Sequence, residues 1–207
     1  MKIGIIGAGH IGGTLAGLLV KAGHQVAVSN SRGPGSLKSL VNGLGKNSLA
    51  MTVPDAASFG EVIILTVPWR KPEALPPPEV VAGKIVVDAM NPYGQGGSIL
   101  DLGSSTSSEE TAKRLPGCRL VKAFNTIHFK HLQERGTSRK EERIAIYVAG
   151  DDEEAKSVVK QLIEEIGFVP FDTGSLREGG RKQQPGSPIY NNPMTLERAK
   201  DIFNTTA

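Results

Sequence analysis

The stretch MKIGIIGAGHIG, residues 1–12, decides the fold of this chain. Residues 2–6 form an apolar, β-branched run of strand length, which breaks at the pattern G-x-G-x-x-G where a helical pattern begins. In a β-α-β dinucleotide-binding unit the first glycine permits a tight turn, the second lets backbone N–H groups approach a pyrophosphate, and the third lets the helix pack closely on the strand. The predicted phosphate-binding loop contains Gly7, Ala8, Gly9, His10, Ile11 and Gly12.

The end of the second strand indicates the phosphorylation state of the dinucleotide. The first helix stops at Gly23, and residues 25–28 have the pattern of a second buried strand. An NAD-specific site normally ends this strand with Asp or Glu, which binds the ribose 2′-OH. Here Asn30, Ser31 and Arg32 follow instead, and a guanidinium binds a 2′-phosphate through charge-assisted hydrogen bonds. The sequence predicts NADP(H); the alternative for Arg32 is a solvated loop charge.

Composition excludes several classes of protein. With 207 residues the chain can bury the core of one α/β domain but not of two large ones. The net charge of +3 comes from 24 basic and 21 acidic side chains, a balance that predicts binding to neither nucleic acid nor membrane. The one cysteine excludes an intramolecular disulfide, and neither a stretch of transmembrane length nor a signal-peptide pattern is present. We therefore expect a cytoplasmic protein.

Strand and helix patterns alternate along the chain, which is typical of a parallel sheet with both faces covered. We predict a Rossmann-type, doubly wound α/β fold with a mostly parallel sheet of about eight strands. The NADP-binding domain spans residues 1–176, and a short tail and helix span residues 177–207. The expected strands are residues 2–6, 25–28, 49–53, 62–67, 84–88, 120–123, 143–149 and 168–171.

Three later helices are also expected. Residues 108–115 follow a capping box formed by Ser107 and Glu110. Residues 151–166 begin with an acidic run, which favours a helix N-terminus over a metal site because of the helix dipole. The last helix covers residues 195–203.

Ligands of open α/β sheets lie beyond the carboxyl ends of the strands, so the residues after each strand are candidate site residues. Asn91 and Asn125 have amides that can bind the ribose or the nicotinamide amide, whereas loop and cap chemistry is the alternative. His128 and His131 are read as ordinary helix residues, and no metal is predicted. No catalytic residue is assigned, because hydride transfer between stacked rings depends mainly on position. The candidates after strands four to six are Thr66, Val67, Pro68, Asn91, Pro92 and Asn125.

Several segments over residues 1 to about 176 carry a family resemblance: GAGHIG, SNSRGP, TVPW, AGKIVVDAMNP, LPGCRLVKAFNTI and AGDDEEAKSVVKQLIEEIGFVPFDTGSL. They resemble the NADP oxidoreductases dependent on the deazaflavin coenzyme F-420 and the related cytosolic reductase domain of six-transmembrane metalloreductases. The resemblance implies an NADP(H)-dependent reductase with a small-molecule hydride acceptor, either the deazaflavin or a flavin. It places the acceptor ring near Pro68, Asn125 and Ile127, and it implies a homodimer. The chain has no counterpart of the transmembrane haem domain, and its tail differs, which leaves the acceptor site and the dimer contact open.

Two other functions stay open. A dehydrogenase of the β-hydroxyacid or imine-reducing type shares the Rossmann opening but needs a large helical second domain, for which too little chain follows the eighth strand. A non-enzymatic NADP(H) sensor or partner-binding module fits the missing acid–base machinery.

Overall fold

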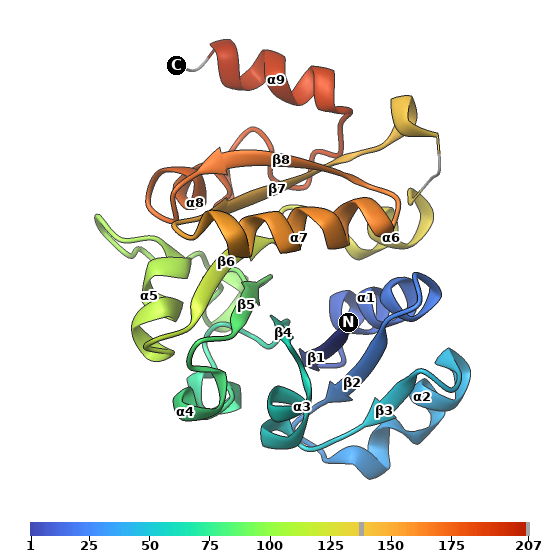
Figure 1. Ribbon diagram of the computed structural model, residues 1–207. Coiled ribbons are helices and arrows are strands. Elements are labelled where there is room, and N and C mark those ends of the chain that lie inside the picture. The colour runs from blue at the N-terminus through green and yellow to red at the C-terminus, as the bar shows by residue number, and fades with distance from the viewer. Residues whose placement is uncertain (137–138, 206–207) are drawn as a thin grey trace.

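A computed structural model describes residues 1–136 and 139–205 of the chain, and its centre is a single eight-stranded sheet (Figure 1). The strand order is β3-β2-β1-β4-β5-β6-β7-β8. The expected α/β fold with a mostly parallel sheet is confirmed. The strands are β1 (Lys2–Ile6), β2 (Gln25–Ser29), β3 (Ser48–Ala50), β4 (Val62–Leu65), β5 (Ile85–Asp88), β6 (Arg119–Ala123), β7 (Ala145–Gly150) and β8 (Val169–Gly174).

The last two strands run against the others. β1 to β6 are mutually parallel, β7 is antiparallel to β6, and β8 is parallel to β7. The reason lies in the connection after β6, where the six-residue helix α6 (Phe129–Glu134) packs on α1 (His10–Lys21) instead of crossing the sheet. β7 therefore begins at the end of the sheet where β6 finishes, as an antiparallel pairing requires.

Helices cover both faces of the sheet, so the fold is doubly wound. On one face, α1, α6, α2 (Lys38–Leu44) and α7 (Glu153–Glu165) enclose a core that includes Ile3, Ile5, Val28, Val87 and Val121. On the other face, α3 (Val53–Phe59), α4 (Pro78–Val81) and α5 (Ser107–Arg114) cover the alternate residues, among them Ile6, Ile63 and Val86. Successive strand residues point to opposite faces, which explains the uninterrupted apolar runs of the sequence. Among the residues that the structure describes there are also four short 3₁₀ turns: η1 (Pro34–Leu37), η2 (Pro72–Ala74), η3 (Gln95–Gly97) and η4 (Lys140–Glu142).

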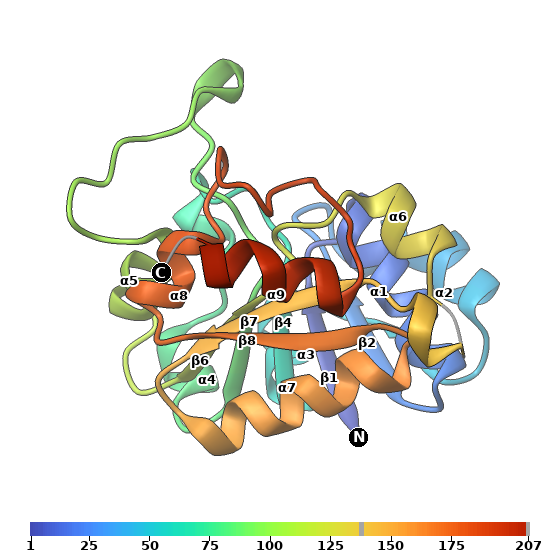
Figure 2. The same ribbon diagram turned by 90° about the horizontal axis from the view of Figure 1, so that it is seen from above.

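The C-terminal residues cover β7 and β8 on the side opposite α7. Helix α8 (Glu178–Lys182) packs on both strands, and α9 (Leu196–Thr205) lies over them, roughly along their direction (Figure 2). The ring centroids of Phe171 and Phe203 are 4.8 Å apart, and Tyr147 lies between strand and helix in the same apolar cluster. None of the helices in the described part of the chain combines the length and the apolar character that a membrane crossing requires.

Local capping chemistry moves some of the expected boundaries. The third strand ends at Ala50 rather than residue 53, because the Thr52 hydroxyl accepts a hydrogen bond from Asp55 N and begins α3. The capping box expected at Ser107 and Glu110 was wrong by one residue. Thr106 Oγ1 accepts from Glu109 N at 3.1 Å, and Glu109 Oε2 accepts from Thr106 N at 2.7 Å.

The acidic run before α7 is a helix N-terminus, as expected. The Asp152 carboxylate accepts a hydrogen bond from Ala155 N at 2.9 Å. It also pairs with Arg119, which holds the pKa of this carboxyl well below its usual range.

Candidate cofactor-binding site

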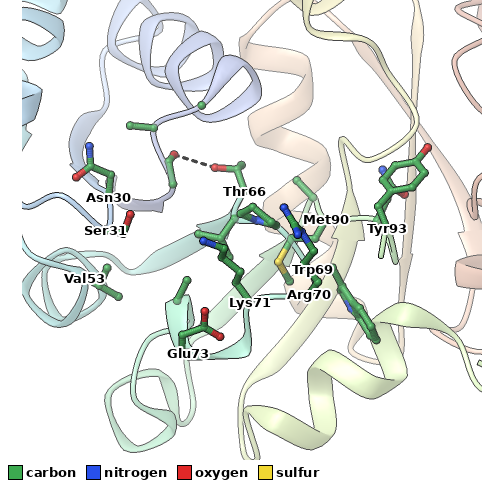
Figure 3. A pocket seen from close by; sticks show the side chains of 18 of the residues that line it. Asn30, Ser31, Val53, Thr66, Trp69, Arg70, Lys71, Glu73, Met90 and Tyr93 are labelled. Carbon is green, nitrogen blue, oxygen red and sulfur yellow. Dashed lines mark hydrogen bonds between the residues drawn. The ribbon is translucent and has the colours of Figure 1, made fainter. Parts of the chain in front are cut away.

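The carboxyl ends of β1, β2, β4 and β5 open onto one cavity of about 840 Å³ (Figure 3). Cavities of a few hundred to a thousand Å³ are typical of small-molecule and cofactor sites. Ten of the residues predicted from the sequence line this cavity: Gly7, Ala8, Gly9, Asn30, Ser31, Arg32, Thr66, Val67, Pro68 and Asn91.

The three glycines of the first loop have different environments. Gly7 has a φ of 112°, a conformation that L side chains rarely adopt. A Cβ on Gly12 would collide with the carbonyl oxygen of Gly7, so the helix can approach the loop only without one. At Gly9, by contrast, nothing lies within 4 Å of the place where a Cβ would stand. The Thr66 hydroxyl at the end of β4 donates to Gly7 O at 2.8 Å and fixes the loop (Figure 3).

The loop after β2 is shaped by the side chain of Asn30. Its Oδ1 accepts from Arg32 N at 2.9 Å, and its Nδ2 donates to Ser36 Oγ at 2.9 Å. This arrangement places Ser31 and Arg32 on the cavity wall. The strand itself ends at the buried Ser29, whose hydroxyl donates to Ile5 O, so no carboxylate stands at the end of β2.

Basic side chains predominate around the cavity. Arg70 and Lys71 of the segment after β4 line it together with Arg32, whereas Glu73 is the acidic residue of the lining. Neither Arg70 nor Lys71 has a side-chain ion pair within the part of the chain that the structure describes. The cavity therefore favours an anionic ligand. Sequence reasoning missed both residues, although they directly follow the TVPW motif that it singled out.

Five predicted residues lie elsewhere. The exposed His10 stacks on Phe129 with ring centroids 4.2 Å apart and lines a groove of about 620 Å³ on the outer side of α1. Gly12 serves helix packing, and Pro92 is buried with its carbonyl bonded to Leu100 N. The other two, Ile11 and Asn125, line a smaller cavity of about 170 Å³.

The smaller cavity adjoins the larger one, because Ala89 and Asn91 line both. Asn91 and Asn125 are hydrogen-bonded to each other: Asn125 Nδ2 donates to Asn91 Oδ1 at 3.1 Å, and Asn91 Nδ2 donates to Asn125 O at 2.9 Å. Phe124, between β6 and Asn125, has a φ of 64°, which is unusual for a residue other than glycine. Strain of this kind costs about 1–3 kcal/mol and gathers at functional sites.

A buried ion pair supports the turn that carries Asn91. Lys122 Nζ donates to Met90 O at 3.1 Å and lies 3.7 Å from Asp88 Oδ2, while Asp88 Oδ1 accepts from Met90 N at 2.9 Å. Both side chains are fully buried. Burial lowers the pKa of Lys122, and the Asp88 carboxylate opposes that shift. A lysine inside an apolar strand is the sequence signal for this pair, and the sequence analysis assigns it no role.

Fold and cavity together define a dinucleotide-binding protein of the Rossmann type. Residues 2–92 match the family model of the NADP oxidoreductases described as coenzyme F420-dependent. The F420-dependent NADP reductase of Methanothermobacter thermautotrophicus is 30% identical over 97% of this chain and 92% of its own length. The chain therefore belongs to the family of F420-dependent NADP reductases, which are NADP-dependent oxidoreductases.

Two further similarities differ in extent. Metalloreductase STEAP3 of Rattus norvegicus is 34% identical to this chain in a match that covers 84% of this chain. The same match covers only 34% of the length of STEAP3. The crystal structure of the hypothetical protein SMa0349 from Sinorhizobium meliloti has a TM-score of 0.83 and 32% identity, and the match covers 94% of this chain and 95% of that one. The second similarity extends beyond residue 176 into the tail.

Proposed function

We propose that the protein binds NADPH in the large cavity and passes a hydride to a small-molecule acceptor of the deazaflavin or flavin class. One observation carries the proposal: the glycine loop, Arg32 and Asn91 line a single cavity. In NADPH the diphosphate, the 2′-phosphate and the nicotinamide are three separate groups. The glycine loop suits the diphosphate, Arg32 the 2′-phosphate and Asn91 the nicotinamide.

The residues of the cavity would divide the work of binding. Backbone N–H groups at the start of α1 suit the diphosphate, because a helix N-terminus carries partial positive charge. Arg32 and Ser31 suit the 2′-phosphate, and Arg70 and Lys71 add positive charge to the same cavity. Pro68 would form the cavity wall beside the nicotinamide. NADPH supplies the hydride from its nicotinamide ring, and the protein's part is to hold donor and acceptor rings together.

The test is NADPH oxidation by the purified protein, followed by absorbance, with the deazaflavin coenzyme, FMN, FAD, riboflavin and ferric chelates as acceptors. NADH is run in parallel with each acceptor. Turnover with the deazaflavin or a flavin and a preference for NADPH would support the proposal. Tight NADPH binding without turnover on any acceptor would contradict it and favour a non-enzymatic NADP(H) sensor.

A further inference from the structure

The C-terminal segment of residues 183–191 is fastened to the loops that follow β5 and β6. Gln183 O accepts from Asn125 Nδ2 at 2.8 Å, and Asn191 N donates to Thr126 O at 2.8 Å. Tyr190 lines the small cavity, and its side chain reaches the loop after β5. The segment precedes α9 and arches over this end of the sheet (Figure 2). The tail therefore forms part of the wall of the small cavity.

Asn125 offers an unused hydrogen-bond acceptor in this wall. Its Nδ2 donates to Gln183 O and to Asn91 Oδ1, so the orientation of the amide is fixed by two acceptors. Its Oδ1 is buried and has no hydrogen-bond partner within the described chain. Asn125 itself is only 4% exposed and lines the small cavity. Buried polar atoms are nearly always paired, so an unpaired one at a cavity indicates a missing donor.

The tyrosine pair beside it offers an unused donor. Tyr93 Oη and Tyr190 Oη are 2.8 Å apart, and Asn91 Nδ2 donates to Tyr190 Oη at 3.3 Å. Each hydroxyl has one proton, and one proton suffices for the bond between them. Whichever tyrosine donates, the other keeps a proton for a further acceptor. Burial, and then the hydrogen bond with Tyr93, raise the pKa of Tyr190, so its hydroxyl stays protonated at neutral pH.

We propose that Asn125 Oδ1 and the free hydroxyl proton of the Tyr93–Tyr190 pair form a subsite that recognises an amide group, –C(=O)–NH–, of a bound ligand. The amide N–H would donate to Asn125, and the tyrosine proton would bind the amide oxygen. Both groups belong to the two adjoining cavities, since Tyr93 lines the larger and Asn125 and Tyr190 the smaller. This inference rests on the proposed function, which places a nicotinamide and its acceptor at this end of the site.

Two ligands of the proposed reaction contain an amide. One is the carboxamide of the nicotinamide, and the other is the lactam edge of a flavin or deazaflavin ring. The geometry is the same for both, so binding measurements with analogues must separate them. In either case the tail residue Tyr190 takes part in ligand recognition.

The first experiment uses calorimetric titration with NADP⁺ and with its 3-acetylpyridine analogue, in which a methyl group replaces the amide NH₂. If the subsite reads the carboxamide, the wild-type protein binds NADP⁺ about tenfold more tightly, because the analogue leaves Asn125 Oδ1 unpaired. Asn125→Ala then removes this preference. Tyr93→Phe with Tyr190→Phe weakens both ligands to a similar extent, because both keep the carbonyl.

The second experiment compares riboflavin with 3-methylriboflavin, which lacks the lactam N–H, by their binding to the NADP⁺-saturated protein. If the subsite binds the acceptor, riboflavin binds more tightly than 3-methylriboflavin, and Asn125→Ala removes this difference. NADP⁺ and its 3-acetylpyridine analogue then bind equally. Ratios are read in both experiments, since a variant with a loosened tail loses affinity for both members of a pair. Tyr147→Phe is the matched control, because it removes a buried hydroxyl from the cluster under α9.

A wild-type protein that binds each pair equally overturns the subsite, as does a preference that survives Asn125→Ala. An unchanged affinity in the double tyrosine variant also overturns it. Failure of the proposed function is distinct, because it would show as NADPH binding without turnover on any acceptor, or as no NADP⁺ binding at all, whereas failure of the subsite shows only in the binding ratios.

Discussion

At the scale of single residues, we propose that Arg32 gives the protein its preference for NADP(H). The strand before it ends without a carboxylate, and the guanidinium stands on the cavity wall beside Ser31. The backbone N–H of the exposed Arg32 donates to Asn30 Oδ1, and its side chain has no ion pair among the residues that the structure describes. Its side chain is thus free to bind a phosphate.

Arg32→Ala should weaken NADPH binding by about 10- to 100-fold and NADH binding little, because a charge-assisted hydrogen bond contributes about 1.5–3 kcal/mol. Titration calorimetry with both dinucleotides measures the two changes. The exposed Arg135, which lies outside the cavity, supplies the control variant Arg135→Ala. An equal loss for both dinucleotides would show that Arg32 does not contact the 2′-phosphate.

The sequence predicted those cavity-lining residues that form local patterns. The glycine loop and Ser31–Arg32 were found because each lies within a few residues of a strand end. Tyr190 was not found, since its contacts with Asn91 and Tyr93 join residues 99 and 97 positions apart. Periodicity and motif spacing contain no information about such contacts.

At the scale of elements, two glycines of the β1–α1 unit are expected to have different roles: Gly9 in cofactor binding and Gly12 in helix packing. The Cβ position of Gly9 is open, whereas that of Gly12 is filled by the carbonyl oxygen of Gly7. The same motif therefore contains one open position on the cavity wall and one position in close contact with the backbone of the loop.

Gly9→Val should abolish binding of both NADPH and NADH while leaving the thermal transition nearly unchanged, because the added methyls occupy the space that the diphosphate needs. Gly12→Ala should lower the free energy of unfolding by about 1–3 kcal/mol, since overpacking against a backbone atom forces the helix to shift. Calorimetric binding and thermal denaturation are measured on both variants. Retained cofactor binding in Gly9→Val would count against the phosphate loop.

The buried ion pair between Asp88 of β5 and Lys122 of β6 gives a prediction on stability. Lys122→Met should lower the free energy of unfolding by about 3–5 kcal/mol, because it leaves the Asp88 charge buried without its partner. Adding Asp88→Asn should restore part of the loss. Urea denaturation of both variants measures these changes. A Lys122→Met variant as stable as the wild type would refute the structural role of the pair.

Element boundaries were predicted less well than element types. The third strand and the α5 capping box were displaced because neighbouring Thr and Ser residues can all cap a helix, and only the backbone shows which one does. The apolar strands other than the third and the eighth were predicted to within one or two residues at each end, because a run such as residues 62–65, within the predicted strand 62–67, can be buried only inside the sheet.

At the scale of the whole molecule, the chain builds one sheet from two opposed groups of strands. The first six parallel strands hold the cofactor cavity, whereas β7 and β8 carry the tail. Alternating strand and helix patterns predicted the first group, but the reversal at β7 depends on how the short α6 packs. The homodimer and the cytoplasmic location stay predictions.

The two groups should respond separately to substitution. Phe203→Ala removes a ring that packs on Phe171 and Tyr147, and we expect the free energy of unfolding to fall by about 1–3 kcal/mol for this partly buried side chain. NADPH affinity should stay within about twofold, because distant sites act independently. Chemical denaturation and calorimetry test both statements. A parallel loss of NADPH affinity would mean that α9 and the large cavity are coupled.

A crystal structure with NADP⁺ tests the central claim most directly. It should show the diphosphate at Gly7 to Gly9, the 2′-phosphate within hydrogen-bond distance of Arg32, and the nicotinamide at the end of the cavity lined by Pro68 and Asn91. A dinucleotide bound with its 2′-phosphate away from Arg32, or bound outside this cavity, would contradict the account.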